Sequence, residues 1–185
     1  AAYQRYLFEF NLRCDGSSKF LDGSKYGYFP SASVGWIFSE EPFINKYVKG
    51  WLNHAKLRVS YGVLGNNSGV GRYEQQETLT TNNYMIDGKI LKGYVNKKMV
   101  NRDLSWEETS VTNIGLDMKF FNNRLSVELD FYDRLTSGMI RPSDMSVHLT
   151  GAYSAPRKNI GELRNKGVEA NIVWRGRVNE FNYTV

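Results

Sequence analysis

The feature that most constrains the fold is a pair of alternating segments within residues 113–135. In each segment, apolar residues occupy every second position and polar residues occupy the positions between them. Phe121, Asn122 and Asn123 separate the two segments, and asparagine tolerates the positive φ that a tight turn needs. This arrangement predicts a β-hairpin with one apolar and one polar face. The apolar positions are Ile114, Leu116, Met118, Phe120, Leu125, Val127, Leu129 and Phe131.

The polar face of this hairpin carries charges of both signs in the middle of its strands. Unpaired charges are costly in a soluble core, but in a water-filled lumen they are solvated or pair across strands. The pattern therefore fits either a half-buried soluble sheet or a barrel wall with lipid outside and water inside. We expect Asp117 and Lys119 to lie close to Arg124 and Glu128 across the turn. In the barrel interpretation, the lumen-facing residues are Arg58, Asp117, Lys119, Arg124, Glu128 and Glu169. Their role is contact with a solute or, alternatively, generic polarity of the lumen.

The same alternation predicts further strands on both sides of the hairpin. A short helical turn is expected after Pro42, and Asp87-Gly88 suggests a small hairpin within residues 84–95. Long loops are expected at residues 64–105 and 136–158, and Gly167 is expected to permit a bend or bulge. The other predicted strands cover residues 3–14, 28–38, 54–63, 165–174 and 181–185.

Three patterns favour an outer-membrane β-barrel over a soluble β-sandwich. The predicted strands are about ten residues long, which suits a tilted strand that crosses a bilayer. Connections alternate between longer and shorter, so one end of the sheet carries short turns and the other carries long loops. Aromatic residues gather at strand ends, as in interfacial girdles, whereas a sandwich core gathers them mid-strand. They are Tyr6, Trp36, Phe38, Phe120 and Trp174 at the short-turn end and Tyr28, Tyr61 and, more weakly, Trp106 at the other.

The predicted fold is therefore all-β: an antiparallel transmembrane β-barrel segment of about seven strands. Bacterial barrels formed by one chain have even strand numbers, so an odd number implies a larger wall. Both ends of the sequence fall inside strand patterns. We therefore expect the 185 residues to be an internal piece of a longer chain, with edge strands that pair outside this sequence.

Composition argues against several other classes of function. The net charge is +5, but the basic residues form no long run, so nucleic-acid binding has little support. Cys14 is the only cysteine, and His54 and His148 are the only histidines, at opposite ends of the predicted sheet. Glycines at residues 62–71 lack the lysine and hydroxyl residue of a phosphate-binding loop. We predict no enzymatic activity, no catalytic or metal-binding residues and no cofactor.

The long loops carry the recognition hypothesis. The segment 64–105 is rich in Gly, Asn, Thr and Tyr. Aromatic side chains on loops of a rigid scaffold often stack on sugar rings or pack on a partner. The alternative is that these rings pack loop against loop. The candidates are Tyr73, Tyr84, Tyr94, Trp106 and Tyr153.

Six sequence segments, distributed over nearly the whole chain, resemble those of a known protein family in content and order. They are RYLFEFNLRCDGSSKF, FPSASVGW followed by SEEPF, KLRVSYGVLGNN, LSWEETSVTNIGLD, NNRLSVELDFYDRLTSGMI and NIGELRNKGVEANI. They resemble those of the SusC/RagA family of TonB-dependent outer-membrane transporters from Bacteroidota. The resemblance implies that residues 1–185 are part of one receptor barrel domain of about 22 strands. It places this piece in the C-terminal half, without the plug domain, the TonB-contact segment or the final strands.

The resemblance also implies a function. Proteins of this family import nutrients, and here the solute would be an oligosaccharide or a peptide. The expected partners are a SusD-like surface lipoprotein, the TonB complex and the lipid of the bacterial outer membrane. A passive porin or adhesin-like barrel is the alternative, followed by a soluble β-sandwich that binds a ligand.

Overall fold

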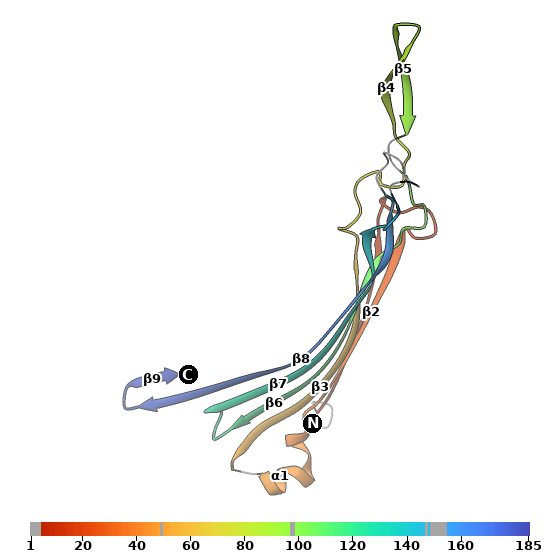
Figure 1. Cartoon of the computed structure of the whole chain (residues 1–185). Coiled ribbons are helices and arrows are strands. Elements are labelled where there is room, and N and C mark those ends of the chain that lie inside the picture. Colours follow the sequence, from red (N-terminus) through yellow and green to blue (C-terminus); the bar gives the residue numbers. More distant parts are fainter. Residues whose placement is uncertain (1–4, 49, 97–98, 147, 149–154) are drawn as a thin grey trace.

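The computed structural model describes residues 5–48, 50–96, 99–146, 148 and 155–185. Seven strands form one antiparallel sheet, in the order β1-β2-β3-β6-β7-β8-β9, and β4 and β5 form a separate hairpin (Figure 1). No helix in these ranges is long and apolar enough to cross a membrane. The strands are β1 Tyr6–Gly16, β2 Tyr26–Trp36, β3 Leu52–Asn66, β4 Leu79–Ile86, β5 Lys89–Asn96, β6 Glu107–Phe120, β7 Leu125–Pro142, β8 Arg157–Val178 and β9 Phe181–Thr184. The helices are η2 Phe38–Glu40 and α1 Pro42–Val48.

The two ends of the large sheet carry different connections. The turn end holds the β6–β7 turn, the β8–β9 turn and the connector with η2 and α1. The loop end holds the β1–β2 loop, the excursion that contains β4 and β5, and the β7–β8 connection. The β6–β7 and β8–β9 turns are short, as predicted, but the β2–β3 connector at residues 37–51 is longer than the β1–β2 loop at residues 17–25. Figure 1 shows the β4–β5 hairpin standing away from the loop end.

The hairpin predicted from the alternating segments is confirmed. β6 and β7 pair from Glu108↔Ser137 to Phe120↔Leu125. Phe121, Asn122 and Asn123 all have positive φ, at 53°, 56° and 64°. Three successive left-handed residues reverse the chain tightly enough for the strands to pair up to the turn.

Strand lengths differ from the predictions at the loop end. β7 continues to Pro142 and β8 begins at Arg157, so the predicted loop at 136–158 is shorter than expected. The alternation fades there because charged residues, Asp133, Arg164 and Lys166, occupy positions of the apolar face. Of the bend or bulge expected at Gly167, the bulge does not occur, since this residue pairs regularly with Tyr132. The register instead shifts around Met139, next to Gly138, which has a φ of 62°.

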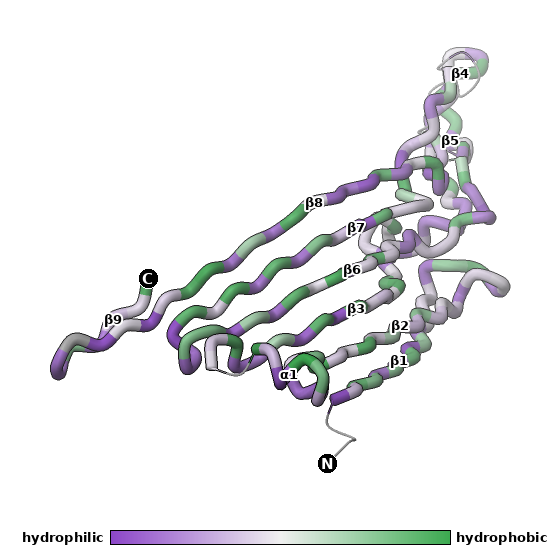
Figure 2. The backbone as a smooth tube through the Cα atoms, turned by 90° about the horizontal axis from the view of Figure 1, so that it is seen from below, coloured by the Kyte–Doolittle hydropathy of each residue, from purple (hydrophilic) through white to green (hydrophobic). Residues whose placement is uncertain are grey.

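Strand register places all the predicted apolar positions on one face of the sheet. One straight row of paired residues crosses six strands. Phe8 at one end of this row is 77% exposed and Val168 at the other is 73% exposed. The hydropathy colouring in Figure 2 shows the alternation along each strand. This apolar face is therefore not the core of the described structure. The row is Phe8, Val34, Val59, Ile114, Phe131 and Val168.

The hydrophobic core lies at the loop end instead. Phe20, Val70, Leu104 and Ile140 form a buried cluster, and Trp106 packs against it. The ring centroids of Phe20 and Trp106 lie 5.2 Å apart. These residues come from four separate segments. The loops therefore pack together with the end of β7 to form a layer at the loop end of the sheet.

The β4–β5 hairpin confirms the prediction made from Asp87-Gly88. All eight residue pairs from Leu79↔Asn96 to Ile86↔Lys89 are in register. Asp87 and Gly88 have φ values of 50° and 73°, as a two-residue hairpin turn requires.

The connector at the turn end is held by one carboxylate. Glu41 immediately precedes α1, whose first residue is Pro42, as expected for a residue without an N–H to donate. Tyr6 Oη donates a hydrogen bond to Glu41 Oε1 at 2.7 Å, and Trp36 Nε1 donates to the same atom at 3.3 Å. Arg5 Nη1 lies 3.1 Å from Glu41 Oε2. These contacts, led by the hydrogen bond from Tyr6, lower the pKa of Glu41.

The depressed pKa makes the stability of this region depend on pH. The ionised carboxylate stabilises the fold above about pH 4.5, the ordinary value for glutamate, and this contribution is lost as pH falls through the lowered pKa. We expect Glu41→Gln to lower the unfolding temperature of the purified full-length protein at pH 7. The difference from the native protein should shrink below pH 4. Parallel melting curves measured from pH 3 to 8 test this.

Glu40→Gln is the matched control, because Glu40 is the exposed neighbour of Glu41. It should leave the melting profile unchanged. A Glu41→Gln variant that melts like the native protein at pH 7 would contradict this role of the carboxylate.

Candidate functional site

The polar face of the sheet is organised around Arg58 in β3. Its guanidinium binds Asp117 of β6 through two hydrogen bonds, Nε to Oδ2 and Nη2 to Oδ1, both 2.8 Å long. Nη2 also donates to Asp130 of β7, at 3.1 Å and 3.3 Å from the two carboxylate oxygens. One cation therefore links three neighbouring strands on this face.

Gly115 makes this linkage sterically possible. Its backbone lies between Arg58 and Asp130 in register. A Cβ at this position would lie 2.7 Å from Arg58 Cζ and 2.5 Å from Asp130 Oδ1. Any side chain here would therefore displace the guanidinium from the surface of the sheet. Gly35 lies in register on the other side of Arg58.

The surface around this network is acidic towards β8. Asp117 lies directly opposite Glu128, and Asp130 lies opposite Glu169. Like charges in such positions repel each other, and Arg58 compensates for only part of the negative charge. Asn171 Nδ2 donates a hydrogen bond to Glu128 at 3.2 Å.

An open hollow of about 500 Å³ lies beside these carboxylates. It offers amide, phenol and carboxylate groups together with two cationic side chains, so it can bind polar groups of either charge. Its polar lining residues are Asn113, Asp130, Tyr132, Arg134, Asn165, Lys166 and Glu169.

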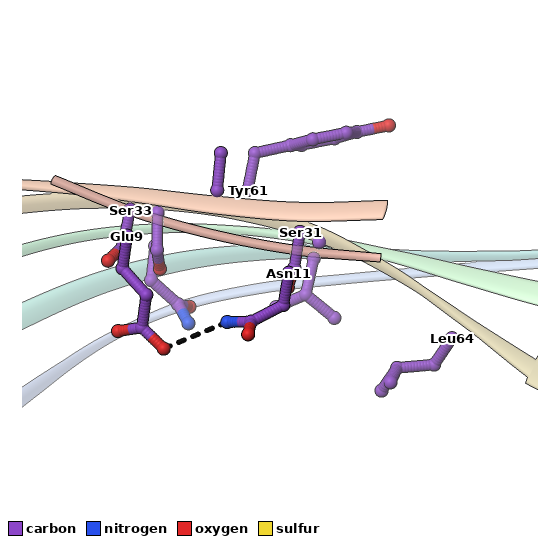
Figure 3. Close-up of a pocket in the computed structure, with 11 residues that line it drawn as sticks. Glu9, Asn11, Ser31, Ser33, Tyr61 and Leu64 are labelled. Carbon is purple, nitrogen blue, oxygen red and sulfur yellow. Dashed lines mark hydrogen bonds between the residues drawn. The ribbon is translucent and has the colours of Figure 1, made fainter. Parts of the chain in front are cut away.

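Towards β1 the polar face is lined by small hydroxyl groups. Figure 3 shows Glu9, Asn11, Ser31 and Ser33 on one side of the sheet and the ring of Tyr61 on the other. Asn11 Nδ2 donates a hydrogen bond to Glu9 Oε1 at 2.8 Å. The face is thus polar across its width, and its strongest charges lie over β3 and β6–β8.

The structure brings only some of the predicted polar-face residues together. Asp117 lies across from Glu128, as expected, but its cationic partner is Arg58 rather than Arg124. Lys119 pairs in register with Ser126, and Arg124 lies at the turn. Glu169 belongs to the acidic surface. Contact of any of these residues with a solute stays a prediction.

Two residues outside the predicted site set shape this surface. Asp130 lies on the polar face with Glu128, as the alternation along β7 predicts. No signal in the sequence indicates the role of Gly115, because that role depends on the register between β3, β6 and β7.

The loop aromatic residues lie in different surroundings. Tyr84 and Tyr94 lie on opposite faces of the β4–β5 hairpin, and Tyr94 is 71% exposed. Tyr73 is also exposed, whereas Trp106 packs in the loop core between Phe20 and Phe29. Trp106 therefore follows the packing alternative, while Tyr73, Tyr84 and Tyr94 are free to meet a partner. Tyr153 lies outside the described residues.

No group of three or more His, Cys, Asp or Glu side chains placed to hold a metal ion occurs among the described residues. His54 lies in β3 at the turn end, and His148 follows β7 at the loop end.

Gly115 provides a direct test of the Arg58 network. We expect Gly115→Ala to destabilise the full-length protein by about 1–3 kcal/mol, because the new methyl group overlaps the guanidinium and Asp130. Denaturant unfolding of the folded barrel measures the change.

Gly35→Ala is the matched control on the other side of Arg58. Its Cβ would meet the Lys56 side chain at 3.0 Å, and a lysine can move aside. Equal destabilisation by the two variants would contradict a specific role for Gly115.

Comparison with known proteins identifies the family. A family model described as "TonB dependent receptor-like, beta-barrel" matches residues 2–185. The TonB-dependent receptor SusC of Bacteroides thetaiotaomicron is 33% identical over 171 residues, which are 91% of this chain and 17% of SusC. The TonB-dependent receptor P3 of Formosa agariphila is 33% identical over 178 residues, which are 95% of this chain and 17% of that protein.

Solved structures give the same result. The structure of the RagAB peptide transporter matches with a TM-score of 0.80 and 32% identity, over 98% of this chain and 20% of the transporter chain. The siderophore receptor PirA of Pseudomonas aeruginosa, with 13% identity and a TM-score of 0.56, shares the fold. The chain spans about a fifth of the length of the proteins it matches.

The open seven-stranded sheet is therefore a partial barrel wall rather than a sandwich. The chain belongs to the TonB-dependent receptor-like β-barrel family and forms a transmembrane segment of a larger barrel in the bacterial outer membrane.

Proposed function

We propose that this chain forms part of the wall and outer loops of a TonB-dependent importer of oligosaccharides or peptides. The observation that carries the proposal is the pairing of a continuous exposed apolar face with an opposite face of hydrogen-bonding and charged groups. The apolar face would contact lipid, and the polar face would line the lumen. The plug and the TonB-contacting segment would lie elsewhere in the full-length protein.

The proposed lumen lining combines Arg58, Asp117, Glu128, Asp130 and Glu169. Arg58 is committed to two carboxylates, so it fixes the wall more than it attracts a solute. The carboxylates of Glu128 and Glu169 are exposed on the polar face, which would be the lumen side of the wall. They suit a solute or plug surface that offers hydroxyl, amide or cationic groups, rather than an anionic one.

The substrate class has support from one relative in particular. The similar structure with the higher TM-score is that of a peptide transporter, which favours a peptide. The family resemblance carried by the six sequence segments keeps an oligosaccharide as the second candidate. Both solutes are rich in neutral hydrogen-bonding groups, in keeping with the serines and asparagines of the polar face and with Tyr132.

The β4–β5 hairpin is the proposed contact for a SusD-like lipoprotein. It stands away from the packed loops, and its large side chains are exposed on both faces. Leu79, Met85, Ile90 and Tyr94 are each more than two-thirds exposed, at 69%, 74%, 67% and 71%. A protruding apolar hairpin of this kind fits a partner that covers the loop end.

Removal of the hairpin tests this partner. Residues 79–96 are replaced by Gly-Ser-Gly, which leaves Val70 and Leu104 of the loop core in place. We expect the barrel to insert and fold normally, while co-purification of the lipoprotein and solute uptake fall roughly tenfold or more, as when a cluster of interface anchors is lost. Unchanged co-purification would exclude the hairpin as the contact.

Tyr84→Ala and Tyr94→Ala form a matched pair for the two faces of the hairpin. Only the variant on the contacting face should weaken the complex.

To separate an importer from a passive porin, uptake is measured in cells with and without TonB. Uptake that continues without TonB would favour the porin.

The lipid-facing orientation gives a further prediction. Val127 lies in the apolar face at the height of the Glu128–Asn171 pair on the polar face. We expect Val127→Arg to cost about 2–4 kcal/mol, the penalty for a cation near the bilayer midplane. Asn171→Arg, at the same height on the polar face, should cost little. Reversible unfolding in lipid vesicles measures both, and similar costs would contradict the orientation.

A further inference from the structure

The connector between β2 and β3 begins against the apolar face of the sheet. Glu41 accepts hydrogen bonds from Tyr6 and Trp36, which are paired residues of that face. Ala55, on the same face of β3, is completely buried, and η2 is the helix that contacts β3. The connector therefore covers the lipid side of the sheet at the turn end, rather than the lumen side.

The connector also ends on the apolar face. Trp51, which follows α1, stacks on Phe120 with ring centroids 5.8 Å apart and planes 10° from parallel. Phe120 lies in the apolar face together with Met118 and Leu116. The aromatic surface of the barrel wall thus continues directly into the connector.

α1 turns two more aromatic rings away from the sheet. Because helical positions advance by about 100° per residue, Phe43 and Tyr47 share one side, and Ile44 and Val48 share another about 100° around the helix. Ile44 and Val48 are partly buried, whereas Phe43 is 62% and Tyr47 is 80% exposed. Lys46, in the last turn, is also exposed. Apolar rings stabilise a protein when they are removed from water, so their exposure here would not stabilise the protein in water.

We infer that α1 is an interfacial anchor that lies in the headgroup layer of the outer membrane at the turn end. Phe43 and Tyr47 face the lipid, Trp51 joins them to the aromatic surface of the wall, and Lys46 meets anionic headgroups. Tyrosine and tryptophan favour this layer because their rings are apolar and their polar atoms reach water. This role goes beyond the proposed import function, since the connector packs on the apolar face of the wall rather than on the proposed lumen lining.

Continuity with the apolar face favours lipid over a protein partner. The lipid-facing surface of a barrel ends at the headgroup layer, and the aromatic rings of the connector begin where that surface ends. A second copy of the receptor or a periplasmic protein on the same rings would shield them from lipid. Those two occupants are outcomes of the test.

The test measures the depth of a spin label on the full-length receptor in phosphatidylethanolamine–phosphatidylglycerol vesicles. Cys14→Ser removes the cysteine of this chain, any other free cysteine is also replaced, and Tyr47→Cys carries the label. Collision with oxygen, which enriches in lipid, is compared with collision with a water-soluble nickel chelate. We expect the oxygen-to-nickel ratio at Tyr47→Cys to exceed that at an aqueous site about threefold, as for an interfacial position.

Three labelled variants provide the scale. Phe131→Cys lies within the apolar face and should report contact with lipid, whereas Tyr94→Cys on the exposed hairpin should report water. Asn45→Cys lies on α1 itself, about 200° around the helix from both aromatic residues, and should show less contact with oxygen than Tyr47→Cys. Phe43→Cys provides an independent reading from the same side as Tyr47, should one variant fail to fold.

Two results would overturn the inference. A ratio at Tyr47→Cys and Phe43→Cys equal to that at Tyr94→Cys would place α1 in water. Protection of both sites from oxygen and from nickel alike would show that protein covers the helix. Intermediate ratios, between those of Phe131→Cys and Tyr94→Cys, support the anchor.

Discussion

Strand register is the constraint on which the rest of this structure depends. Because side chains alternate along a strand, a slip of one residue in any pairing would turn that strand's apolar set from lipid to lumen. The register holds Phe8, Val34, Val59, Ile114, Phe131 and Val168 in one row. On the opposite face it brings Arg58, Gly115 and Asp130 together, so a slip that exposed charge to lipid would also break the ion network. The two faces therefore reinforce one register.

The sequence was a good guide to the sheet because its signal repeats locally. Alternation located the seven strands of the wall, and Asn122-Asn123 and Asp87-Gly88 located two hairpin turns that the structure confirms. The loop-end parts of β7 after residue 135 and of β8 before residue 165 were not predicted, because alternation fades where neither face meets lipid. The resemblance supplied the family, which local patterns alone left open between a barrel and a sandwich.

The candidate site was harder to predict because its contacts join residues far apart in sequence. Arg58 and Asp130 are separated in sequence by strand β6 and by the excursion that contains β4 and β5, and nothing near either residue indicates the pairing. Trp106 looked like an exposed loop aromatic residue, yet its ring fills a core built from four segments. Composition can indicate that a loop is aromatic, but only the packed structure distinguishes rings that hold the loops together from rings that remain free.

The slope of the apolar surface links register to the membrane. On β2 the apolar-face run from Tyr26 to Trp36 is centred near Ser31, while on β8 the run from Val168 to Trp174 is centred near Asn171. Relative to the row through Val34 and Val168, the two centres differ by about six residues, or ~20 Å, over four strand spacings of ~4.8 Å. The apolar band therefore crosses the strands at roughly 45°, close to the tilt of strands in membrane barrels. A flat lipid slab explains this slant, because it cuts every tilted strand at the same height. The core of a soluble sandwich imposes no such slant, since its apolar positions follow the facing sheet.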